Sequence, residues 1–143
     1  MNSNDIQYLR YLRIGHFINA GLLFLIALFP VIHLGVGIAM VAGMFESEND
    51  PPPVFLGYLF VGIALVIIAM FATLGVLNLI AARNLGEYRN WIFCVVMAAV
   101  NIMFSPIGLV IGIFSLVVLL RESVKQLFEH GGQPRTGQMP DWR

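Results

Sequence analysis

Charged residues are scarce in this chain and absent from long stretches of it. Lysine, arginine, aspartate and glutamate make up 11% of the 143 residues, and the formal net charge is zero. Eight scattered basic residues cannot form the positive surface that nucleic acid requires, which excludes a nucleic-acid partner. No charged residue occurs in residues 14–45 or 54–82. Because 59% of the residues are hydrophobic, the composition is typical of an integral membrane protein whose surroundings are a lipid bilayer.

The chain also lacks the residue groups that most chemistry requires. Its single cysteine, Cys94, excludes an internal disulfide and a paired-cysteine redox motif. The apolar blocks hold no paired carboxylates, histidine cluster or activated nucleophile, so we predict no catalytic residue, no cofactor and no metal site. His33, followed by Met40 and Met44, could be a metal ligand, but a locally bonded interfacial histidine and packing methionines fit better.

Four apolar blocks predict four helices, two of them too long for a membrane and two too short. Residues 14–45 and 54–82 would reach about 48 Å and 44 Å as helices, against a hydrocarbon core of roughly 30 Å. Residues 91–104 and 107–120 would each reach about 21 Å. We therefore predict an all-α, antiparallel four-helix membrane bundle. Its long first hairpin has helices over 5–45 and 54–83, and its short second hairpin covers 88–130, with the last helix running straight on through 121–130.

The basic residues predict the orientation of this bundle. All eight lie before the first block, between the second and third, or after the fourth. Four spans then leave every positive charge on the cytoplasmic side of a bacterial inner membrane, with both termini inside. The inner turn is predicted at 84–86 and the outer turn at Ser105 and Pro106. We expect residues 1–130 to form the transmembrane domain and residues 131–143 a disordered cytoplasmic tail.

Counting residues along each helix from the arginine expected at the inner membrane interface predicts one layer of polar side chains within the bundle. Four side chains lie five or six residues from an interfacial arginine, roughly 8 Å into the bilayer: Asn19, Asn78, Cys94 and Ser115. No Asp, Glu, Lys, Arg or His is expected in that layer. We interpret it as polar contacts that hold helices together, and a polar pathway is the alternative.

Small residues recur at four-residue spacing in two places. Gly108 and Gly112 are expected to pack within the bundle, whereas Gly35, Ala39 and Gly43 occur where the first helix exceeds the bilayer. An apolar surface outside the bilayer needs a cover, so the second series predicts contact with another copy of the chain. The competing arrangement breaks the first helix at Pro30 and lays residues 31–45 along the outer interface, and the sequence leaves this open.

Several short motifs spread over the chain give it a resemblance to a group of known proteins. They are Phe-Pro-x-x-His ending at His33, the triple proline 51–53, Trp91-x-x-Cys94, the Phe-Ser-Pro-x-Gly-x-x-x-Gly-x-Phe run from Phe104, and Leu-Arg-x-Ser-Val from Leu120. With them the chain resembles a group of small, uncharacterised four-span bacterial inner-membrane proteins. The resemblance implies the fold and the location, and it implies no activity.

Three functions remain to be weighed. The first is a non-catalytic membrane protein that acts by self-association or by contact with another membrane protein. The second is an oligomeric channel or small-solute conduit, with Asn19, Thr73, Asn78 or Asn101 facing a pore. The third, an enzyme acting on lipid or quinone, lacks the reactive groups that it would need. The first function agrees best with the excess apolar length and the small-residue series.

Overall fold

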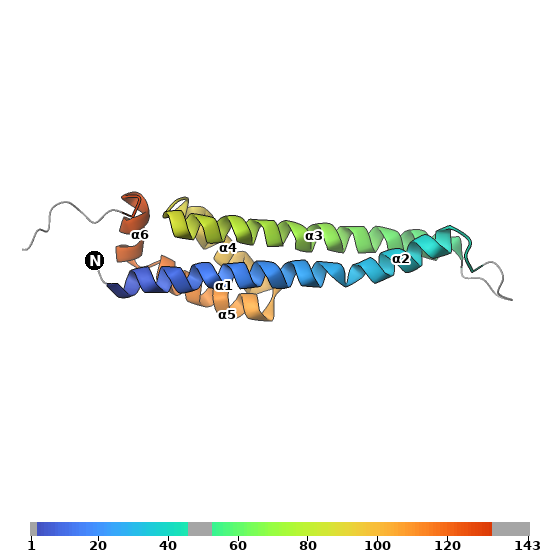
Figure 1. Cartoon of the computed structure of the whole chain (residues 1–143), viewed down its shortest axis with the longest axis horizontal. Coiled ribbons are helices and arrows are strands. Elements are labelled where there is room, and N and C mark those ends of the chain that lie inside the picture. Colours follow the sequence, from blue (N-terminus) through green and yellow to red (C-terminus); the bar gives the residue numbers. More distant parts are fainter. Residues whose placement is uncertain (1–2, 46–52, 133–143) are drawn as a thin grey trace, which may run out of the picture. The chain divides into compact units, whose positions relative to one another are not determined.

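The computed structural model describes residues 3–45 and 53–132, and these residues form six helices and no strand (Figure 1). The predicted all-α class is confirmed. The helices are α1 (Ser3–Leu28), α2 (Pro30–Val41), α3 (Val54–Glu87), α4 (Trp91–Phe104), α5 (Pro106–Leu119) and α6 (Glu122–Glu129). The predicted tail lies outside the described residues, except for Gly131 and Gly132.

Two helical segments have the length and composition needed to cross a membrane. They are Asp5–Val41, with 37 residues, and Val54–Glu87, with 34. A third exists only if α5 and α6 are taken together across the bend of 79° between them, and α4 is a shorter apolar helix. The chain divides into two compact units, which we treat separately: unit 1 comprises 1–19 and 77–143, and unit 2 comprises Ala20–Val76.

Pro30 interrupts the hydrogen bonds of the first long segment without ending it. Proline has no N–H, so the regular bond at this position is lost. The neighbouring N–H groups of Phe29 and Ile32 instead donate to carbonyl oxygens three residues back, at 3.1 Å and 3.3 Å. Phe29 keeps a right-handed helical backbone, with φ −59° and ψ −46°. The prediction of one helix over 5–45 therefore needs correction: the segment is two helices in succession, and the second ends at Val41.

Within unit 2, α2 packs against the start of α3 through two glycines. A Cβ on Gly37 would lie 2.9 Å from the carbonyl oxygen of Gly57, and a Cβ on Gly57 would lie 2.9 Å from side-chain atoms of Met40 and Val41. Small residues let two helix backbones approach this closely. Within unit 2, α2 therefore stays against α3 (Figure 1), and the alternative that lays residues 31–45 along the outer membrane interface stays a prediction.

This glycine contact generates a test in which two substitutions on one helix are compared. Gly57→Ala places a methyl group against Met40 and Val41, whereas Gly62→Ala adds the same group where nothing lies within 4 Å. Both gain the same helix propensity, so the difference between them reports the contact. We expect Gly57→Ala to be less stable than Gly62→Ala by about 1–3 kcal/mol in detergent unfolding. Equal stabilities would contradict the close packing of α2 on α3.

In unit 1, α4 and α5 form a helical hairpin joined by the single residue Ser105. Its backbone is extended (φ −155°, ψ 135°), and its hydroxyl accepts the Gly108 N–H at 3.2 Å. Pro106 occupies the first position of α5, as predicted, where its missing N–H costs nothing. A Cβ on Gly108 would lie 2.5 Å from the Asn101 carbonyl oxygen, and one on Gly112 would collide with that of Ala98. These two glycines thus permit close packing within the hairpin, as the sequence predicted.

The last helix does not run straight on, which corrects the prediction for residues 121–130. After α5 the backbone of Arg121 is extended, and α6 turns by 79° (Figure 1). Val124 and Leu127 are buried in a cluster that also holds Leu9 and Leu12. Turning α6 buries this apolar face, which a straight helix would have left exposed.

One ion pair accompanies the bend of α6. The Arg121 guanidinium lies 3.4 Å from the carboxylate of Asp5 and 5.3 Å from the ring centroid of Tyr8, both on α1. The Asp5 side chain is only 4% exposed, so the pair supplies a buried carboxylate with a charged partner. It therefore ties the start of α6 to the start of α1.

The turn between α3 and α4 comes later than predicted. The sequence indicated 84–86, but α3 continues through Glu87, and Leu85 is buried. Tyr88 and Asn90 have positive φ angles, 53° and 51°, and they reverse the chain instead. Asparagine tolerates this left-handed conformation, whereas tyrosine adopts it less readily. Gly86, which seemed the natural turn residue, stays helical and packs beside Arg13.

Candidate functional site

Five polar side chains meet in the interior of unit 1, and each of the helices α1, α3, α4 and α5 supplies at least one. They are His16 and Asn19 from α1, Asn78 from α3, Asn101 from α4 and Ser115 from α5. All five are buried, with relative exposures of 0–2%. Buried polar groups are costly unless they bond to one another. We call these five residues the polar cluster.

A reciprocal amide pair forms the centre of the polar cluster. Asn78 Nδ2 donates to Asn101 Oδ1 at 2.9 Å, and Asn101 Nδ2 donates to Asn78 Oδ1 at 2.8 Å. Asn19 Nδ2 lies within bonding distance of both oxygens, at 3.4 Å and 3.2 Å. Each amide of this pair donates to and accepts from the other, across two consecutive antiparallel helices. The paired amides therefore stabilise the packing of α3 against α4 directly.

His16 connects this amide pair to α5. Its Nδ1 lies 3.0 Å from Asn78 Oδ1, and its Nε2 lies 3.3 Å from Ser115 Oγ. A carbonyl oxygen can only accept, so we assign the proton of the neutral ring to Nδ1. Nε2 then accepts from the Ser115 hydroxyl. The imidazole thus bridges α1, α3 and α5, and an ionisable residue lies among the amides.

Asn19 is bonded on one side only. Its Nδ2 donates into the amide pair, whereas its Oδ1 has no hydrogen-bond partner among the described residues. Flipping the amide would set its oxygen against two other carbonyl oxygens, so the assigned orientation is the better one. Asn19 therefore contributes less to the polar cluster than Asn78, whose oxygen faces three nitrogens.

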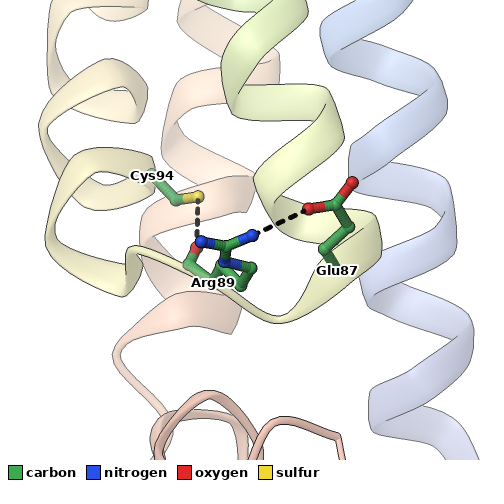
Figure 2. Close-up of polar contacts among 3 residues, drawn as sticks. All are labelled: Glu87, Arg89 and Cys94. Atoms are coloured by element: carbon green, nitrogen blue, oxygen red, sulfur yellow. Dashed lines mark hydrogen bonds and ion pairs between the residues drawn. The ribbon is translucent and has the colours of Figure 1, made fainter.

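Cys94 does not join the polar cluster, although the sequence placed it in the same layer. Its thiol faces the carbonyl oxygen of Ala81 at 3.9 Å. It also faces the carbonyl oxygen of Arg89 at 4.0 Å, next to the turn between α3 and α4 (Figure 2). These are weak contacts of a poor donor. The neighbouring Arg89–Glu87 ion pair, at 3.7 Å, is largely exposed and contributes little (Figure 2). Cys94 is a buried residue of the apolar cluster around Leu9.

Of the predicted layer, Asn19, Asn78 and Ser115 come together, and two further members were missed. His16 was expected outside the layer, yet it lies one helical turn before Asn19 on the same face of α1. That spacing could have identified it. Asn101 was considered only as a pore residue. Asn101 lies on the helix that follows Asn78 in the sequence and packs antiparallel to it. That arrangement could have indicated that the two amides meet.

The structure describes the surroundings of the residues in the predicted oligomer contact. A Cβ on Gly35 would meet nothing within 4 Å, and Ala39 lies within α2. Gly43 lies beyond the end of α2 with φ 72°, and the N–H groups of Gly43 and Met44 bond back to Met40 and Ala39. This is the usual hydrogen-bonding pattern of a glycine that ends a helix. Gly43 thus also ends α2, and Gly35, Ala39 and Gly43 stay the predicted contact with another copy.

His33 also has different surroundings from those expected. Its ring stacks on Phe60 with centroids 6.1 Å apart and lies 5.6 Å from the ring of Phe29. It is therefore in aromatic contact within unit 2. Within residues 3–45 and 53–132, no group of three His, Cys, Asp or Glu side chains could hold a metal ion.

Comparisons with family models, with curated proteins and with solved structures gave no match to this chain. Function must therefore be argued from the geometry of the site itself.

The polar cluster predicts a ranking of substitutions. Asn78→Leu leaves the amide of Asn101 and the His16 ring without their main partner, so we expect a loss of about 1–2 kcal/mol in unfolding free energy. Asn19→Leu removes an unpartnered oxygen along with its bonds and should cost less, about 0.5–1 kcal/mol. Thr73→Val is the control, because that exposed hydroxyl bonds only to the Ala69 carbonyl of its own helix. Steric-trap or detergent unfolding that gave all three the same stability would contradict the ranking.

Proposed function

We propose that this chain is an integral membrane protein that acts without catalysis, by self-association or by contact with another membrane protein. The observation that carries the proposal is the length of the two apolar segments. Residues 54–82 are uncharged and would extend about 44 Å. At the average tilt of about 20° they still cover about 41 Å along the membrane normal, some 10 Å more than the hydrocarbon core.

The surface of unit 2 supports this proposal. Near the joined ends of α2 and α3, large apolar side chains are strongly exposed: Ile38 by 54%, Phe55 by 68% and Tyr58 by 63%. The two helices approach each other closely at Gly37 and Gly57, and these three side chains remain outside that contact. Where this surface exceeds the bilayer, another protein surface is its natural cover.

The short hairpin agrees with a membrane setting as well. Each of α4 and α5 has 14 residues, about 21 Å, so their turn would end within a bilayer core of roughly 30 Å. Backbone groups at such depth need partners within the protein. Ser105 and Pro106 meet this demand, since the hydroxyl accepts an N–H and the proline has none to satisfy. We propose that four helices integrate in this way, with both termini in the cytoplasm of a bacterium.

A conduit is the alternative function. The side chains proposed for a pore are occupied with one another, because Asn19, Asn78 and Asn101 bond mutually in the buried interior. Thr73 bonds to its own helix. A pore would have to form between copies of the chain from other residues. We therefore rank the conduit second, and solute flux through liposomes that contain the purified parent chain, above that of empty liposomes, would reverse the ranking.

Orientation is tested by labelling introduced cysteines in intact cells, in a Cys94→Ala background. We expect Arg89→Cys to react only after permeabilisation, because that exposed position follows α3 on the proposed cytoplasmic side. Glu48→Cys should react in intact cells. Labelling of position 89 from outside would contradict the topology, and recovery of the protein in the soluble fraction would contradict membrane integration.

Self-association is tested with two matched glycine substitutions. Gly35→Leu fills open space on α2 at the predicted contact, and Gly21→Leu fills open space on α1 away from it. We expect the parent to be oligomeric by mass in mild detergent, Gly35→Leu to shift it towards monomer, and Gly21→Leu to leave it unchanged. A monomeric parent would contradict self-association. An oligomer insensitive to Gly35→Leu would contradict the assigned contact.

A further inference from the structure

A groove on unit 1 lies between the end of α3, the start of α4 and α6. Its volume is about 870 Å³. Apolar side chains form one part of its lining: Ile80, Ile92, Phe93 and Val96. Polar and charged side chains form another: Asn84, Asn90, Lys125 and Glu129. The groove is separate from the polar cluster and plays no part in it.

The two kinds of lining are ordered along the groove. On α3, Asn84 lies one turn closer to the helix end than Ile80. Asn90 immediately precedes α4, which starts after that same turn, and the apolar lining of α4 begins in its first turn with Ile92 and Phe93 and continues to Val96. On both sides of the turn a polar residue therefore lies nearest to it, and the apolar lining extends from there along the helices. A ligand that fits must be an amphiphile, with a polar head and an apolar tail.

The charges in the groove define the polar head. Lys125 and Glu129 are one turn apart on α6, so they share a face of that helix. The ammonium of Lys125 lies 5.8 Å from the ring centroid of Trp91. The ion pairs in the described part of the chain are Arg89–Glu87 and Arg121–Asp5, so neither Lys125 nor Glu129 is neutralised by an ion pair there. One positive and one negative charge thus face the groove about one helical turn apart.

We propose that this groove binds one phospholipid whose headgroup carries both a phosphate and an ammonium group. Lys125, with the amides of Asn84 and Asn90, contacts the phosphate, and Glu129 contacts the ammonium. An acyl chain lies along Ile80, Ile92 and Val96, which are 42%, 70% and 52% exposed. The zero net charge of the head-binding end favours such a zwitterionic lipid over an anionic one. The inference rests on the proposed membrane location, with the α3–α4 turn at the cytoplasmic interface.

The test uses the full chain in nanodiscs of phosphatidylethanolamine and phosphatidylglycerol in equal amounts. Native mass spectrometry after release measures which lipid stays bound. We expect the parent to retain one phosphatidylethanolamine. Lys125→Gln should reduce retention of this lipid by roughly fivefold, the effect expected for one basic residue near a lipid phosphate. Glu129→Gln should reverse the preference towards phosphatidylglycerol. Glu122→Gln, an exposed carboxylate on the same helix outside the groove, is the control and should retain lipid like the parent.

Each other outcome counts against the inference. Retention that is the same in Lys125→Gln and the parent, or equally reduced in Glu122→Gln, would overturn the site. A parent that prefers phosphatidylglycerol would overturn the assignment of the headgroup. A chain that enters nanodiscs but retains no lipid would refute this inference alone, whereas a chain that does not enter them would refute the proposed membrane location first.

Discussion

The reciprocal amide bonds between Asn78 and Asn101 are the interaction on which the arrangement of unit 1 depends. Apolar contacts along a helix permit sliding, because one apolar residue replaces another at small cost. Two paired amides do not permit it, because a one-residue shift moves an amide by about 1.5 Å and rotates it by about 100°. The pair therefore sets the register of α3 against α4, and His16 and Ser115 extend that register to α1 and α5.

Sequence reasoning found much of the polar cluster because each helical residue adds the same rise, so a count of residues gives the position of a side chain along its helix. Asn19, Asn78 and Ser115 were located by counting from arginines, and the structure brings all three together. Counting along one helix says nothing about which face a residue occupies or how an antiparallel neighbour is aligned. His16 and Cys94 show the two errors that result. The first shares a face with Asn19, and the second lies close to the turn that precedes α4.

The remaining errors occurred where the chain reverses or bends. The turn after α3 was expected at a glycine, yet Tyr88 and Asn90 adopt the positive φ angles. No proline or glycine occurs at the bend before α6, so the sequence there does not predict a bend. It arises because Val124 and Leu127 gain burial against residues of α1 that are more than a hundred positions away in the sequence. Burial against residues so distant in the sequence is indicated locally only by the i, i+3 spacing of Val124 and Leu127.

In the proposed membrane setting, the one-residue connection at Ser105 bears on how the α4–α5 hairpin enters the bilayer during synthesis. A loop that crosses a bilayer must shed the water bound to its polar groups, and charged loops make this step slow and dependent on machinery. The α4–α5 connection has no charge, lacks one N–H at Pro106, and has its hydroxyl already bonded to Gly108. In the proposed membrane setting the hairpin can therefore enter the bilayer as a single folded body, without a charged loop to desolvate.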